Sequence, residues 1–128
     1  MIFDNSANEI SVATAGYKPI KILKDNDDKF IDLQPEGVGV GIMEDYDYES
    51  VKMKLESNDL ILLASAGLSK TKNREGTPFG DEKLHRLVLA NAEQTCEEII
   101  EGIKNTVLYY GAGTAQEDDI TIVIAKVK

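Results

Sequence analysis

The order of extended and helical segments is the feature that most constrains the fold of this chain. Residues 60–64 form a continuous apolar run with the length of a buried strand. Two segments of helical periodicity follow, over residues 81–92 and 96–110, and a β-branched strand over 120–127 ends the chain. Several short strand-like segments come before the run. Strands, then two helices, then a last strand favour an antiparallel α+β fold over alternating βαβ units.

The expected local structure can be stated segment by segment. A hairpin turn is predicted at Asp25-Asn26-Asp27-Asp28 and a polar loop over residues 70–76. Thr95 and Glu98 make a capping box at the start of the second helix, and Gly111 is a plausible stop. Besides the strands already named, we expect strands over residues 2–4, 10–13, 20–23, 30–33, 38–42 and 51–55.

Composition narrows the class of protein. A length of 128 residues predicts a single domain over residues 1–128. The net charge of −9 argues against nucleic acid and against an anionic membrane surface as partners. With one cysteine, Cys96, no intrachain disulfide can form, so the reducing cytoplasm is the expected location. No apolar run approaches the length of a membrane-spanning helix.

Clusters of carboxylates are the candidate sites that the residues themselves suggest. Asp25-Asn26-Asp27-Asp28 fails as a Ca²⁺ loop, because Lys29 stands at its fifth position and no glycine follows. The acidic segment over residues 44–49 is either a solvated loop or a docking patch for a basic partner surface. Asp118-Asp119, at the mouth of the last strand, is a solvated strand start or part of a site.

Six segments in a fixed order carry a resemblance to a known family. The last of them, Gln116-Glu117-Asp118-Asp119-Ile120-Thr121, follows the pattern Gln-x-Asp-Asp-Ile-Thr, and Phe79-Gly80 with Leu84 follows Phe-Gly-x-x-x-Leu. In this order the segments resemble the C-terminal half of the bacterial SpoIIE/RsbU-type Ser/Thr phosphatases, within the metal-dependent PPM (type 2C-like) family. The segments are residues 13–19, 37–42, 57–59, 67–73, 79–84 and 116–121.

The resemblance implies a fold and a chemistry. The fold implied by the family is an antiparallel β-sandwich flanked by helices, and residues 1–128 would form its C-terminal portion. Members of the family use Mn²⁺ or Mg²⁺ to activate a water that attacks phosphoserine or phosphothreonine. They act on regulatory proteins, often anti-anti-sigma factors in partner-switching pathways. By the match, Asp118 is the surviving metal ligand, and Asp119 supports the site or holds the start of the strand.

Two departures from the family pattern bear on activity. Ala66 stands where the family has a metal-binding Asp, and Lys70 stands where it usually has Glu. An alanine cannot ligate a hard cation, which needs oxygen donors. The chain also contains no Asp-Gly dipeptide, the motif that holds the family's other metal Asp in its N-terminal half. That half therefore has no counterpart in this sequence.

These departures predict a domain without catalytic residues of its own, inactive as a lone chain and without a tightly bound metal. We expect a regulatory or interaction module (a pseudophosphatase) that pairs with a partner chain or with itself, because half a sandwich leaves an apolar face or edge uncovered. Two alternatives stay open. One is an active phosphatase whose metal site another chain completes, and the other is a plain protein-binding module.

Overall fold

The computed structural model describes all residues from Met1 to Lys128. They divide into two compact units, residues 1–62 with 126–128 and residues 63–125. The chain contains antiparallel sheets and helices, which confirms the predicted α+β class. None of the helices is long and apolar enough to cross a bilayer.

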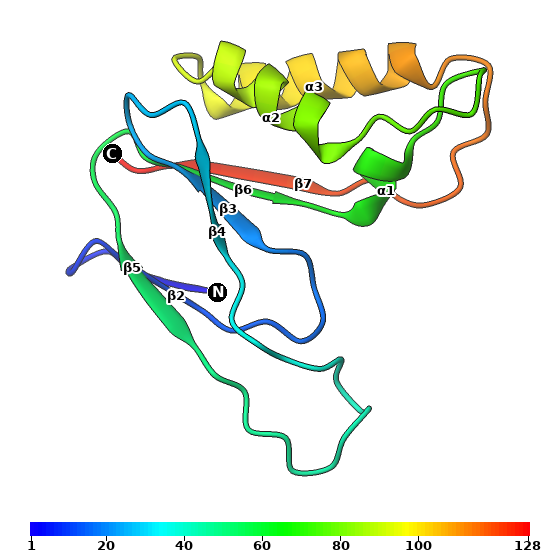
Figure 1. Cartoon of the computed structure of the whole chain (residues 1–128). Helices are drawn as coiled ribbons and strands as arrows, with labels where there is room; N and C mark the ends of the chain where they lie inside the picture. Colours follow the sequence, from blue (N-terminus) through cyan, green and yellow to red (C-terminus); the bar gives the residue numbers. More distant parts are fainter. The chain divides into compact units, whose positions relative to one another are not determined.

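The first unit contains a three-stranded antiparallel sheet in the order β1-β2-β5. Its strands are β1 (Ile2–Asp4), β2 (Glu9–Val12) and β5 (Val51–Lys54) (Figure 1). The Asp4 carboxylate shapes the turn after β1 by accepting hydrogen bonds from the backbone N–H groups of Ser6 and Ala7. Side chains alternate along β2, so Ile10 and Val12 share one face and are fully buried.

A second sheet has the strand order β4-β3-β6-β7. Its strands are β3 (Ile20–Leu23), β4 (Phe30–Leu33), β6 (Leu60–Ala64) and β7 (Ile122–Lys126), and β3 is antiparallel to both β4 and β6. The predicted turn between β3 and β4 is confirmed: Asn26 has a φ of 59°, and the Asp27 N–H donates to the Lys24 carbonyl at 3.1 Å. Strand β6 is buried over its first three residues, as its apolar sequence predicts.

A buried carboxylate joins two segments of the first unit, the turn after β3 and the residues just before β6. Asp59 is fully buried just before β6, and its Oδ2 accepts hydrogen bonds from Lys24 Nζ at 2.6 Å and from the Glu56 N–H at 2.8 Å. Its Oδ1 accepts from the Asp25 N–H at 3.0 Å. Burial alone raises the pKa of Asp59, but these hydrogen bonds and the lysine charge outweigh it and hold the pKa below its usual value.

The prediction of a strand over residues 38–42 is wrong. This segment is a turn, in which the Ile42 N–H donates to the Gly39 carbonyl at 3.2 Å. Gly41 has a φ of 83°, a left-handed conformation that a glycine adopts without strain but that an extended strand excludes. The glycines at positions 37, 39 and 41 permit this loop.

The second unit holds the helices α1 (Ala66–Lys70), α2 (Asp81–Ala90) and α3 (Cys96–Tyr110). Helix α3 has the predicted bounds, and its capping box is confirmed because Thr95 and Glu98 exchange hydrogen bonds. Gly111 ends it as predicted. Helix α2 stops two residues early, at Ala90, where the Asn91 side chain donates to the Leu87 carbonyl at 2.7 Å.

Helix α1 was not predicted from the sequence, which indicated only a polar loop beginning at residue 70. Five residues are too few for hydrophobic periodicity to reveal a helix. Its residues Gly67 and Leu68 are buried, so contacts with the rest of the second unit stabilise it rather than helix propensity.

Candidate functional site

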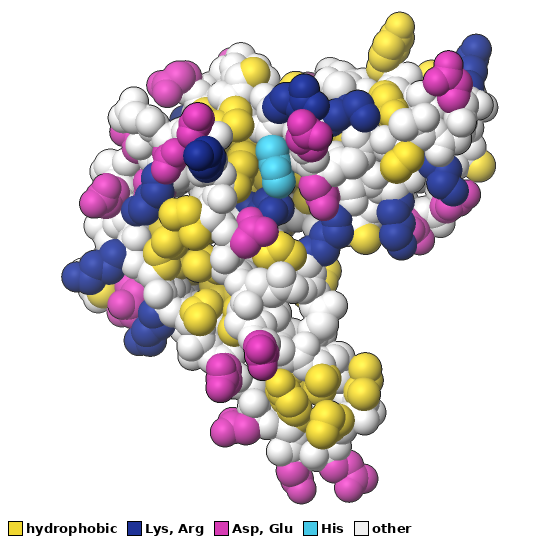
Figure 2. All heavy atoms as spheres, in the orientation of Figure 1, with side chains coloured by type: hydrophobic (Ala, Val, Ile, Leu, Met, Phe, Trp, Pro, Cys, Tyr) yellow, Lys and Arg dark blue, Asp and Glu magenta, His cyan; other side chains and the backbone are white.

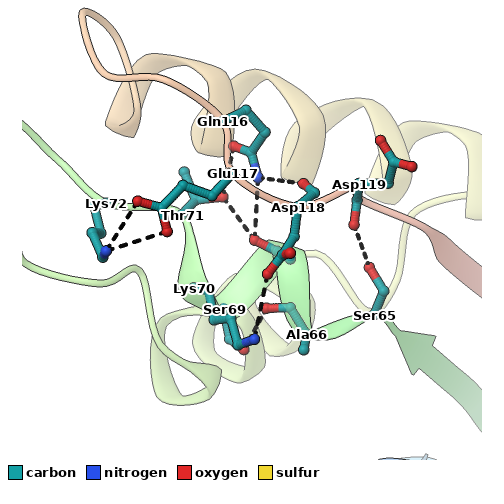
Figure 3. A network of polar contacts seen from close by, with 11 residues as sticks. Ser65, Ala66, Ser69, Lys70, Thr71, Lys72, Gln116, Glu117, Asp118 and Asp119 are labelled. Carbon is teal, nitrogen blue, oxygen red and sulfur yellow. Dashed lines mark hydrogen bonds and ion pairs between the residues drawn. The ribbon is translucent and has the colours of Figure 1, made fainter.

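The candidate site lies in the second unit, where α1 meets the loop that leads into β7 (Figure 3). Ser65, the residue before α1, connects the two segments. Its N–H donates to the Thr121 carbonyl at 2.9 Å, its hydroxyl donates to the Asp119 carbonyl at 3.0 Å, and the same hydroxyl accepts from the Thr121 N–H at 3.0 Å. The loop carrying both predicted carboxylates is therefore fixed against the start of the helix.

Gly67 allows the two segments to approach this closely. A Cβ atom at this position would lie 2.3 Å from the Asp119 carbonyl oxygen and 3.0 Å from that of Asp118. The first of these distances is shorter than any real contact of a Cβ atom, so a larger residue would push the loop away. Ala66, which precedes Gly67, shares one face of α1 with Lys70, four residues further along the helix.

Two polar side chains that were not predicted as site residues also join α1 to the loop before β7. Gln116 Nε2 donates to the Asp118 carbonyl at 2.8 Å and lies 3.4 Å from the Gly67 carbonyl oxygen. The Thr71 hydroxyl lies 3.0 Å from the Gly67 carbonyl and 3.1 Å from Gln116 Oε1. Gln116 belongs to the matched motif over residues 116–121, which was the signal that could have identified it. Thr71 lies in the matched segment over residues 67–73, but nothing in that segment marked its hydroxyl as part of a site.

The carboxylates of Asp118 and Asp119 point in different directions (Figure 3). Asp118 faces α1, and its Oδ2 lies 3.3 Å from Lys70 Nζ. The Asp119 side chain points away from this ion pair, and it is the Asp119 backbone carbonyl that contacts Ser65. A second exposed ion pair, Lys72 with Glu117 at 3.3 Å, lies alongside.

These donors do not fit a tightly held divalent cation. Ala66 contributes no oxygen from its side chain, and the Asp118 carboxylate is paired with the ammonium of Lys70. No three His, Cys, Asp or Glu side chains in the chain gather into a group that could bind a metal ion. Mg²⁺ and Mn²⁺ sites are built from several oxygen ligands, so a single carboxylate paired with a lysine is a poor start.

An apolar groove of about 430 Å³ lies next to the candidate site in the same unit. Helix α3 lines one side with Ile100, Val107 and Leu108, and the segment leading into β7 lines the other with Ile120 and Ile122. Leu108 is 62% exposed and Ile120 is 37% exposed, which is unusual for large apolar side chains that share one groove.

Comparisons with known proteins connect this arrangement to a family. The family model described as Stage II sporulation protein E (SpoIIE) matches residues 1–128, the whole chain. The chain is 25% identical over 126 residues to phosphoserine phosphatase RsbU of Bacillus subtilis (strain 168). That match covers 98% of this chain but 37% of RsbU, so the chain spans about a third of the length of that relative.

Solved structures show the same fold. The SiaA-PP2C domain of Pseudomonas aeruginosa matches with a TM-score of 0.79 at 22% identity, covering 98% of this chain and 49% of that one. The Mn-presoaked phosphatase domain of the cell fate determinant SpoIIE from Bacillus subtilis matches with a TM-score of 0.72 at 21% identity, covering 98% and 54%. The expected likeness to part of a phosphatase domain of this type is thus confirmed at the level of the fold.

Proposed function

Because this chain belongs to the SpoIIE family, we propose that it is the C-terminal portion of a metal-dependent Ser/Thr phosphatase domain and does not catalyse hydrolysis by itself. The observation that carries this proposal is the ion pair of Lys70 with Asp118, together with an alanine at position 66. A lysine ammonium neutralises the one carboxylate that the family pattern assigns to the metal. The alanine at position 66 offers no oxygen ligand to replace this carboxylate.

The role that remains is a regulatory one. RsbU is named as a phosphoserine phosphatase, so a phosphoserine protein is the kind of partner that this chain would meet. An anti-anti-sigma factor is the partner that the family resemblance favours. The chain would bind such a regulator, or a chain that acts on it, in the cytoplasm, and Asp118 and Asp119 would keep only their contacts with Lys70 and Ser65.

The apolar groove supports a protein neighbour. Residues 1–128 match about half of each solved phosphatase domain, and the groove opens between α3 and the segment leading into β7. We expect polypeptide equivalent to the unmatched half to cover it. In the absence of that polypeptide, a second copy of this chain covers the groove. Residues 1–128 would then still unfold as one domain, in a single cooperative transition.

A second candidate is an active phosphatase whose metal site another polypeptide completes. The coverage of 49% of the SiaA-PP2C domain favours it, because the unmatched half can bring further carboxylates to Asp118. In that case the lone chain is inactive for lack of ligands rather than because of Lys70.

Phosphatase assays with a phosphoserine peptide and Mn²⁺, together with calorimetric titration of Mn²⁺, test the first proposal. We expect the wild-type chain to show neither hydrolysis nor binding in the micromolar range. The Asp118→Ala variant should be indistinguishable from it, as should Asp28→Ala, which removes an exposed carboxylate in the first unit. Hydrolysis by the wild type that only Asp118→Ala abolishes would overturn the proposal and establish a working metal site.

A further inference from the structure

The loop over residues 38–49, in the first unit, exposes three large apolar side chains at its turn. Val40 is 83% exposed, Ile42 is 74% exposed and Met43 is 57% exposed. We refer to these three residues as the apolar tip. Single exposed apolar residues are common on protein surfaces, but three within four positions of one loop form a contiguous patch.

The loop has defined internal contacts that hold the tip outward. The Tyr48 hydroxyl donates to the Val38 carbonyl at 3.1 Å and so ties the two sides of the loop together. The rings of Tyr46 and Tyr48 meet edge to face, with centroids 4.9 Å apart. With the two sides tied, the tip is shaped before any partner arrives, which lowers the entropy cost of binding.

The base of the loop is equally restrained. A Cβ atom on Gly37 would lie 2.0 Å from the Thr14 carbonyl oxygen, so only glycine allows this approach. The buried Thr14 hydroxyl donates to the Pro35 carbonyl at 3.0 Å on the same side. The loop therefore leaves the body of the first unit in one direction.

Negative charge surrounds the apolar tip. Glu44, Asp45, Asp47 and Glu49 are all exposed, and we refer to them as the acidic rim. No lysine or arginine occurs from Phe30 to Val51, a segment with six carboxylates in a chain of net charge −9. In Figure 2, hydrophobic side chains gather at the lower edge of the view, where Figure 1 draws this loop, with Asp and Glu side chains around them.

We propose that the apolar tip and the acidic rim form a docking surface for a protein that presents an apolar pocket or helix face bordered by lysines and arginines. The apolar side chains supply the contact area that excludes water. The carboxylates guide a basic partner to the tip and disfavour acidic ones. This inference goes beyond the proposed function, since the loop shares no residue with the candidate site.

The charge pattern favours protein over the other surfaces that an apolar loop can bind. Cytoplasmic membrane surfaces carry anionic lipids, which the four rim carboxylates repel. Nucleic acid is excluded for the same reason, because phosphate binding needs lysine and arginine. A basic, partly apolar protein surface is the remaining class that matches both the tip and the rim.

A pair of labelled peptides provides the probe. One is a synthetic amphipathic helix of about eighteen residues with a leucine face bordered by lysines, and its twin carries glutamates instead of lysines. We expect fluorescence anisotropy to show binding of the basic peptide alone, weakening at least about tenfold between roughly 50 and 300 mM salt. Hydrogen exchange should slow in residues 38–49 on binding.

Matched variants separate this surface from the general negative charge of the chain. Val40→Ser/Ile42→Ser should weaken binding at least about tenfold at every salt concentration, because apolar contact does not depend on salt. Glu44→Gln/Asp45→Asn/Asp47→Asn should weaken it chiefly at low salt. The control Glu93→Gln/Glu97→Gln/Glu101→Gln removes three exposed carboxylates in or beside α3 and should leave binding unchanged.

Several outcomes would overturn the proposal. The two peptides binding equally, the control variant losing as much affinity as the rim variant, or no binding below about 1 mM would each do so. Binding of the wild type, but not of Val40→Ser/Ile42→Ser, to phosphatidylcholine vesicles would assign the tip to membranes. Light scattering that shows a dimer broken only by Val40→Ser/Ile42→Ser would assign it to a second copy of the chain.

Discussion

Lys70 Nζ lies 3.3 Å from Asp118 Oδ2, where helix α1 meets the loop that precedes β7. The lysine and aspartate side chains are 66% and 50% exposed, so solvent screens the pair, and it contributes about 0–1 kcal/mol to stability. Its consequence is chemical rather than structural. In the function proposed above, Asp118 is the carboxylate that a divalent cation would bind, and the ammonium of Lys70 would repel that cation.

Replacing the two departures from the family pattern should create a metal site. Ala66 shares one face of α1 with Lys70, the residue that contacts Asp118, so Ala66→Asp should bring a second carboxylate toward Asp118, and Lys70→Glu replaces the repelling charge with a further oxygen donor. We expect calorimetry to show Mn²⁺ binding in the micromolar range for Ala66→Asp/Lys70→Glu but not for the wild type.

Two controls make that result specific. Adding Asp118→Ala to the double variant should abolish the binding. Ala66→Asp/Lys72→Glu makes the same change in net charge beside Glu117 and should bind much more weakly. Equal affinity of the two double variants would mean that total charge, rather than the geometry around Asp118, attracts the ion.

Substitution of Gly67 should loosen the contact between α1 and the loop over residues 116–121. A methyl group there overlaps the Asp119 carbonyl oxygen, so we expect Gly67→Ala to lower the free energy of unfolding by about 1–3 kcal/mol in urea. Gly102→Ala is the matched control. Gly102 lies in α3 with open space at its Cβ position, and this variant should gain about 0.5–1 kcal/mol from helix propensity.

The ion pair of Lys24 with buried Asp59 should make stability depend on pH. Because the folded pKa of Asp59 is lowered, its contribution is present above the unfolded pKa of about 4 and is lost as pH falls through the folded pKa. Lys24→Met leaves the buried carboxylate without its counter-ion. It should cost about 2–4 kcal/mol at pH 7, and the difference from wild type should shrink below about pH 4.

Lys21→Met provides the comparison for that experiment. Lys21 pairs with Asp32 at 2.7 Å, but the Asp32 side chain is 49% exposed, so its loss should cost less than about 1 kcal/mol. Chemical denaturation at a series of pH values measures both variants. Equal losses at pH 7, or a Lys24→Met loss that does not change with pH, would show that Asp59 does not depend on its counter-ion.

The uncovered groove should cause the lone chain to associate with itself. We expect light scattering to show a mass above that of the monomer at high concentration, because apolar side chains of α3 and the segment leading into β7 are exposed together. Leu108→Lys should shift the chain toward the monomer. Tyr109→Lys, at a position that is 87% exposed and outside the groove, should not. A wild-type chain that stays strictly monomeric would contradict this expectation.

Local signals in the sequence were sufficient for elements whose structure depends on neighbouring residues. The apolar run of β6, the capping box of α3 and the turn at Asn26 all follow from periodicity, capping or turn chemistry within a few residues. The order of strands and helices likewise determined the α+β class, and the motif over residues 116–121 pointed to Asp118.

Tertiary structure decided what depends on residues distant in sequence. The glycines of residues 37–41 are compatible with a strand or a loop, and only the absence of a pairing strand and the positive φ of Gly41 settled the loop. Helix α1 is too short to have a periodicity of its own. The closeness of Lys70 to Asp118 joins positions 48 residues apart, and it exists because Gly67 lets two backbones touch, a contact that no local pattern encodes.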